Sequence, residues 1–273
     1  MAPSKSRQRA LARAKHERQI ARRAAAARRR RQIQASVAAG LAVIAVVVGI
    51  VWAVGGFDSS KKSTTNASDD CAWTPIPATG TVKDVGRPPT TGIAKTGTST
   101  MTITTNQGVV EAQLDRAGAP CTVASFAHLA GKQFFNETKC HRLTTQGIYV
   151  LQCGDPSGTG TGGPAYKFPD EKVPTAPSAA PSASAAPSAN LYPAGTLAMA
   201  NSGPNTNGSQ FFMVYKDGSA LSPNYTVFGK ITKGLDIVEK VAAGGVNPGN
   251  SPTDGEPKTA VTIQSLTVAP TPA

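Results

Sequence analysis

One stretch of the chain decides its fold: Leu197-Ala198-Met199-Ala200-Asn201-Ser202-Gly203-Pro204-Asn205-Thr206-Asn207-Gly208-Ser209-Gln210-Phe211-Phe212. An apolar run at its start and another beginning at Phe211 are separated by Ser, Gly, Pro and Asn, which favour turns. Short apolar runs bounded by turn residues predict two strands joined by a loop. Because side chains alternate between the faces of a strand, Phe211 and Phe212 should point in opposite directions, so that one of them faces the core.

Similar runs lie on both sides of this stretch. Residues 101–114 predict a hairpin whose turn is Asn106-Gln107-Gly108. The spacing of apolar residues predicts helices over residues 121–130 and 235–243. Further strands are predicted at residues 140–144, 148–152, 197–200, 211–215, 226–231 and 261–268. Many short strands with two helices predict a mainly β domain over residues 99–268, built as a closed barrel that the helices cap.

The positive charge of the chain is concentrated in its first 31 residues. The whole chain has a net charge of +12, but residues 1–31 contain twelve Lys or Arg and one acid, Glu17. The remainder carries sixteen bases and fifteen acids, so the folded part has no excess charge that would suit a nucleic-acid groove. We interpret residues 1–31 as a cytoplasmic tail that sets topology and touches anionic lipid. A nucleic-acid or partner-binding arm is the alternative.

An apolar segment follows the tail. Residues 37–57 are all apolar or Gly, and as a helix they would be about 31 Å long, which matches a bilayer core. The sequence therefore predicts a transmembrane helix within residues 32–57, with the C-terminal domain outside the cytoplasm. A cleavable signal peptide is the competing interpretation, although its apolar region would be shorter and an Ala-x-Ala-like site would follow it.

Two further segments have the composition of linkers. Residues 58–98 are rich in Ser, Thr and Pro and predict a flexible tether. Cys71 and Trp73 could dock the middle of this tether onto the domain. Residues 172–194 contain an Ala/Pro/Ser-rich stretch and predict a low-complexity surface loop inside the domain.

The four cysteines, Cys71, Cys121, Cys140 and Cys153, all lie beyond the apolar segment. An even number of cysteines in an oxidising exterior is compatible with two disulfides, in any of three pairings. Four unpaired, buried thiols are the alternative.

Conventional catalytic motifs are excluded by their context. Gly158, Gly160 and Gly163 match a dinucleotide fingerprint, but Pro164 follows and no helix opens there. Adjacent residues of a strand face opposite ways, so Cys140 and His141 cannot form a nucleophile–base pair. With three His in the chain and no Cys-x-x-Cys, we expect no metal site and no cofactor.

A series of motifs nevertheless occurs in a characteristic order. They are His141-Arg142-Leu143, Gln152-Cys153-Gly154-Asp155, Gly160-Thr161-Gly162-Gly163, Lys167-Phe168-Pro169-Asp170-Glu171, the stretch quoted above, and Val227-Phe228-Gly229-Lys230. From about Met101 to Val268 the chain closely resembles the cyclophilin family of peptidyl-prolyl cis/trans isomerases, in a membrane-anchored bacterial form. The resemblance implies an eight-stranded antiparallel barrel with two capping helices and a substrate groove on its outer surface.

The resemblance also implies roles for individual residues. The family's catalytic arginine falls on Arg142. The residues implied to bind substrate are Ile148 or Tyr149, Gln152, Gly160, Ala200, Asn201, Ser202, Gln210, Phe212, Leu221 and Tyr225. The hairpin after Arg142 is about two residues longer than the family pattern, which leaves the choice between Ile148 and Tyr149 open. The family's frequent tryptophan beside the groove falls on Ala220, and its frequent histidine falls on Tyr225.

The implied reaction is rotation about X–Pro bonds of folding or exported polypeptides, without cofactor or covalent intermediate. Proline-containing polypeptides and the membrane, through residues 32–57, are the expected partners, and we expect a monomer that binds no nucleic acid. Two other classes remain: a binding module that holds Pro-containing segments without turnover, and a structural membrane protein whose basic tail carries the function.

Overall fold

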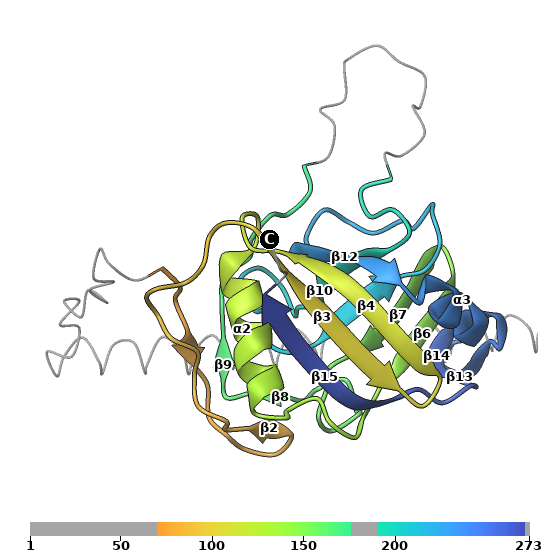
Figure 1. Ribbon diagram of the computed structural model, residues 1–273. Helices are drawn as coiled ribbons and strands as arrows, with labels where there is room; N and C mark the ends of the chain where they lie inside the picture. The colour runs from red at the N-terminus through yellow and green to blue at the C-terminus, as the bar shows by residue number, and fades with distance from the viewer. Residues whose placement is uncertain (1–69, 176–189, 271–273) are drawn as a thin grey trace, which may run out of the picture. The chain divides into compact units, whose positions relative to one another are not determined.

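The computed structural model describes residues 70–175 and 190–270 (Figure 1). The strands are β1 (Thr74–Pro75), β2 (Val82–Lys83), β3 (Thr98–Thr105), β4 (Gly108–Asp115), β5 (Thr138–Lys139), β6 (Arg142–Gln146), β7 (Ile148–Cys153), β8 (Gly163–Pro164), β9 (Tyr166–Lys167), β10 (Thr196–Met199), β11 (Phe211–Val214), β12 (Val227–Lys233), β13 (Val246–Ser251), β14 (Asp254–Pro257) and β15 (Thr262–Pro270). The helices are α2 (Pro120–Gly131) and α3 (Leu235–Ala243).

Eleven of these strands form one sheet, in the order β13-β14-β6-β7-β11-β10-β12-β4-β3-β15-β5. The end strands β13 and β5 are not paired with each other, so the hydrogen-bonded order is open. The predicted closed, eight-stranded barrel is therefore wrong. The mainly β class with two helices is correct, and α2 lies along β15 (Figure 1).

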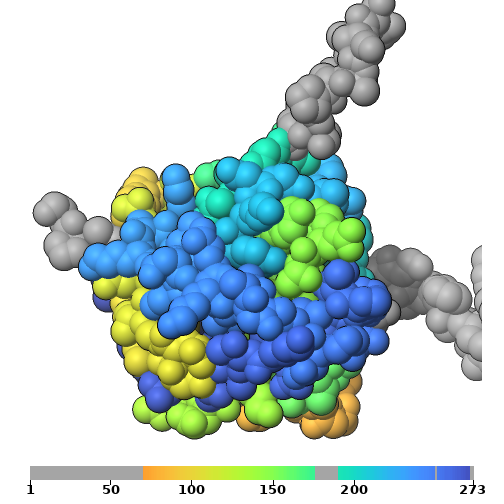
Figure 2. Space-filling model, turned by 90° about the vertical axis from the view of Figure 1, so that its right-hand side faces the viewer, coloured from red at the N-terminus to blue at the C-terminus, as the bar shows by residue number. Residues whose placement is uncertain are grey.

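The sequence did not predict the two strands of the hairpin β13–β14. Its sequence contains Pro248, Gly249, Pro252 and Gly255 and has no alternation of apolar and polar residues, so it resembles a loop. It becomes a hairpin because β14 pairs with β6, with Asp254 opposite Thr144. Figure 2 shows the end of the molecule to which it belongs, where blue C-terminal segments lie between yellow and lime-green parts of the chain.

The main core contains buried residues from the large sheet and from both helices. Alternate residues of β3 and β4 are buried, including Met101, Ile103 and Leu114. Helix α2 adds Phe126, whose ring stacks on Phe135 at a centroid distance of 5.3 Å. Phe211 belongs to this main core.

Residues 70–98, which the composition assigned to a flexible tether, contact the domain. The indole Nε1 of Trp73 donates to the carbonyl of Pro89 at 3.0 Å, and its ring meets Tyr166 and Phe168 edge-on. Strands β1 and β2 pair with β9 and β8. A disulfide joins Cys71 to Cys121 at the start of α2.

A second disulfide joins Cys140 to Cys153, so the prediction of disulfide bonds is confirmed. The described residues contain no free cysteine. In the same residues no helix is long and apolar enough to cross a membrane. The predicted transmembrane helix within residues 32–57 and the tail of residues 1–31 lie outside the described part, as does most of the Ala/Pro/Ser-rich loop.

Candidate functional site

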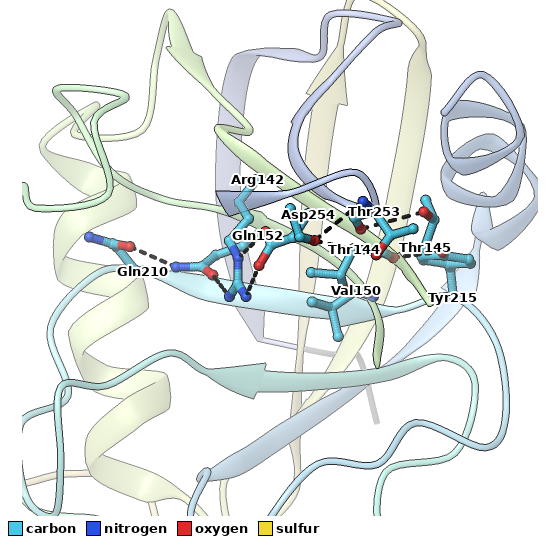
Figure 3. A network of polar contacts seen from close by, with 10 residues as sticks. Arg142, Thr144, Thr145, Val150, Gln152, Gln210, Tyr215, Thr253 and Asp254 are labelled. Atoms are coloured by element: carbon cyan, nitrogen blue, oxygen red, sulfur yellow. Dashed lines mark hydrogen bonds and ion pairs between the residues drawn. The ribbon is translucent and has the colours of Figure 1, made fainter. Parts of the chain in front are cut away.

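Arg142 is the first residue of β6, and its guanidinium is held on two sides (Figure 3). Its Nε and Nη2 donate to the two carboxylate oxygens of Asp254, each at 2.8 Å. Its Nη1 donates to Oε1 of Gln152, the residue opposite Arg142 on β7, at 3.3 Å. Donation of hydrogen bonds to the Asp254 carboxylate raises the pKa of Arg142 above its ordinary value, so the side chain is a constant cation.

The polar contacts continue away from Arg142 along the surface. Gln152 Nε2 donates to Oε1 of Gln210 at 2.9 Å, as Figure 3 shows. Gln210 Nε2 in turn donates to the carbonyls of Gly160 and Gly162, at 3.0 and 2.9 Å. The side-chain oxygen of each glutamine accepts a hydrogen bond from one neighbour, and its NH2 group donates to the next. These hydrogen bonds fix the orientation of both side-chain amides.

The loop that carries Gly160 is built around a buried carboxylate. Asp155 accepts hydrogen bonds from the backbone N–H and hydroxyl of Ser157 and from the amides of Gly160 and Gly162. Burial alone would raise the pKa of Asp155, but these hydrogen bonds outweigh it and lower that pKa below its ordinary value. The loop is therefore anchored on a charged centre.

An apolar cluster, separate from the main core, lies beside these polar groups. Its buried members are Val150, Tyr192, Ala198, Phe212 and Val214. Ile148, Leu191, Ala200, Leu221, Tyr225 and Val227 pack against them and are partly exposed. The ring of Phe212 meets Tyr225 nearly perpendicularly, at a centroid distance of 5.3 Å. We call this set the Phe212 cluster.

The structure places Ile148 and Tyr149 in different clusters. Ile148 packs on the Phe212 cluster, whereas Tyr149 packs on the main core, where its ring lies 6.0 Å from that of Tyr215. The alternation of β7 explains the difference, because Ile148, Val150 and Gln152 share one face. Counting back from Gln152 in steps of two would have identified Val150, which the sequence analysis missed.

The other predicted residues line a cavity of about 390 Å³. Gln152, Gly160, Ala200, Asn201, Ser202 and Gln210 all contribute to its wall. Asn201 is held by a hydrogen bond from its Nδ2 to the carbonyl of Asn224, at 2.8 Å. A second cavity of about 400 Å³ lies on the other side of Gln152 and Gly160 and is lined by Arg142 and Asp254. Gln152 and Gly160 line both cavities, and Ala200 lines the first cavity and also packs against the Phe212 cluster.

Two residues at the site could not be found from the sequence. Asp254 lies 112 residues beyond Arg142, in a hairpin that resembles a loop. Tyr192 lies within residues 172–194, which the composition predicts to be a surface loop, yet its side chain is buried. Its hydroxyl accepts a hydrogen bond from the amide of Tyr225, at 3.1 Å. Within the described ranges, no three His, Cys, Asp or Glu side chains are grouped to hold a metal ion.

Comparisons with known proteins agree on one family. Residues 100–268 match the family model described as "Cyclophilin type peptidyl-prolyl cis-trans isomerase/CLD". A protein of Mycobacterium leprae named "Probable peptidyl-prolyl cis-trans isomerase B" is 49% identical over 211 residues, which are 76% of this chain and 69% of that protein. Its namesake in Mycobacterium tuberculosis strain H37Rv is 46% identical over 75% of this chain and 66% of its own length. A solved cyclophilin-type isomerase of Cryptosporidium parvum has a TM-score of 0.50 at 25% identity, covering 64% of this chain and all of the other.

Proposed function

Because this chain belongs to the cyclophilin-type peptidyl-prolyl cis-trans isomerases, we propose that its surface between Arg142 and Phe212 is where X–Pro bonds rotate. The Phe212 cluster holds the proline ring. Asn201 and its neighbours bind the backbone of the flanking residues, and Arg142 supplies the hydrogen bond that catalysis requires.

The barrier to this rotation is about 18–20 kcal/mol, because the amide is stabilised by resonance. As the bond twists, the prolyl nitrogen loses its conjugation, becomes pyramidal and gains a lone pair that can accept a hydrogen bond. A donor placed at that nitrogen interacts with the twisted state and not with the planar ground states. Such an interaction lowers the barrier instead of merely tightening binding.

The observation that carries this proposal is the arrangement of donors on Arg142. A guanidinium has five N–H donors. Asp254 and Gln152 take three of them. Two remain without a partner in the described structure, and the Arg142 side chain is 37% exposed and lines a cavity. A fixed, permanently charged donor with spare N–H groups is what the twisted bond needs.

Turnover of a proline-containing peptide by the full chain tests this function. We expect catalysed exchange, detected by a conformation-sensitive probe of the cis and trans peptides. Tight binding of the peptide with no acceleration would contradict the proposal and favour a holding module.

The pocket is tested by Phe212→Leu, which keeps the site apolar but removes the aromatic floor. We expect kcat/KM to fall roughly threefold to tenfold, because about 1 kcal/mol of apolar contact with the proline ring is lost. Binding and turnover should weaken together. The matched control is Phe211→Leu, which changes the main core and should lower the melting temperature with kcat/KM unchanged. Equal effects of the two variants on kcat/KM would exclude Phe212 as the pocket floor.

We further propose that the domain acts on folding or exported proteins outside the cytoplasm, as a monomer held at the cell membrane through residues 32–57. Two disulfides suit an oxidising compartment. The basic residues before the apolar segment favour a cytoplasmic N-terminus.

Protease added to intact cells or protoplasts tests this location. We expect the domain to be removed while residues 1–31 stay protected. A protected domain would refute the external location. A mature protein that begins after Phe57 would refute the attachment but not the location.

A further inference from the structure

Arg142 donates two hydrogen bonds to the carboxylate of Asp254. We propose that Asp254 is a positioning residue for catalysis, which fixes the guanidinium of Arg142 so that its remaining N–H groups face the twisting bond. This inference rests on the proposed function of Arg142.

The contact is bidentate. Both donors lie on one edge of the planar guanidinium, and both distances are 2.8 Å. This geometry fixes the plane of the group as well as its position, which a single hydrogen bond would not do. The carboxylate is better shielded than its partner, since the side chains of Asp254 and Arg142 are 19% and 37% exposed. It therefore forms the fixed side of the pair.

Asp254 is itself held by the backbone around it. It pairs with Thr144 on β6, two residues beyond Arg142, and the amide of Thr145 donates to the carbonyl of Thr253 at 2.9 Å. The next residue, Gly255, has no room for a side chain, because a Cβ there would lie 2.0 Å from the carbonyl oxygen of Asn247. Strands β13 and β14 therefore pack closely within the hairpin, and the pairing of β14 with β6 fixes the backbone of Asp254 beside Arg142.

Catalysis needs this restraint because a long, half-exposed arginine otherwise samples many rotamers. Fixing one geometry in advance removes that cost from the transition state. Gln152 contributes on the opposite edge, but through one hydrogen bond of 3.3 Å to a neutral oxygen. The charged pair is the stronger restraint.

The opposite role is also testable, since a carboxylate could instead compete with the substrate for the guanidinium. Positioning predicts that Asp254→Asn lowers kcat, whereas competition predicts that it raises kcat. The matched control is Glu256→Gln, which removes an exposed carboxylate two residues away on β14. Any effect of the lost charge alone should appear in both variants.

We expect Asp254→Asn to lower kcat about tenfold with KM changed less than twofold, because the donor is misplaced while the Phe212 cluster is intact. Asp254→Glu should recover part of the loss, and Glu256→Gln should retain the parent rate. NMR of the Arg142 Nε–H group should show faster exchange with water in Asp254→Asn, in protein whose melting curve shows that it is folded. In the Arg142→Ala background, Asp254→Asn should have no further effect on kcat.

Two results would overturn the inference while leaving the proposed function standing: an unchanged or raised kcat in Asp254→Asn, or an equal loss in Glu256→Gln, provided that Arg142→Ala is impaired. If Arg142→Ala is itself unimpaired, the proposed function of Arg142 fails, and this inference fails with it.

Discussion

Replacement of Arg142 by alanine should lower kcat/KM for a proline-containing peptide by about 10²–10³-fold, comparable to the removal of one oxyanion-type donor. The reason is that the lost hydrogen bond is made in the twisted state alone. Peptide binding should fall much less, because the Phe212 cluster and the contacts around Asn201 are separate from the guanidinium. Peptide exchange kinetics and equilibrium binding, measured on the same preparation, check both parts.

Arg142→Lys is the informative companion. An ammonium keeps the charge but is a strongly hydrated point donor without a planar fork, so it cannot satisfy Asp254 and Gln152 and still present a fixed N–H. We expect it to recover little of the activity. A folded Arg142→Ala protein that isomerises peptides as fast as the parent would show that the donor has been assigned to the wrong residue.

The second large effect is expected on stability. Replacing both Cys71 and Cys121 by serine should lower the free energy of unfolding by about 4 kcal/mol, because the disulfide closes a loop of 50 residues in the unfolded chain. Urea unfolding of the parent and the variant under non-reducing conditions measures this loss of free energy. The matched control is the Cys140/Cys153 pair, whose separation of 13 residues predicts a loss of about 3 kcal/mol.

The comparison also tests how residues 70–98 are held. If the Cys71/Cys121 variant unfolds with the parent's midpoint, the contacts of Trp73 and the short strands β1 and β2 suffice to hold the segment. In that case the disulfide contributes nothing to the folded domain.

Local patterns predicted most of the elements, and long-range pairing explains what they missed. The hairpin β3–β4 and helix α3 were predictable because their apolar residues follow a regular period. Phe211 and Phe212 fall in different clusters, as strand alternation requires. The hairpin β13–β14 has no such period, since its residues are fixed by β6, more than a hundred positions earlier. Because the predicted strands did not include β13 and β14, the order of the eleven-stranded sheet could not be predicted from them.

The same limit applies to the site. The residues that resemble family motifs were found by their order along the chain, and the structure brings them together on one surface. Asp254 is part of no such motif, so its contact with Arg142 can be recognised only from the folded structure. The choice between Ile148 and Tyr149 likewise depended on where the β6–β7 turn begins, and Gly147, with φ at 71°, sets that point.

Strand β11 is buried on both faces, with Phe211 in the main core and Phe212 in the second cluster. The floor of the proposed proline pocket is therefore one side of the wall that encloses the hydrophobic interior. Such a wall cannot open without disrupting the core, so we expect the floor of the proposed pocket to keep its shape before any ligand arrives. A proline ring entering it meets preformed walls and loses little affinity to ordering them. Selectivity among polypeptides must then come from the exposed loops that surround this rigid floor.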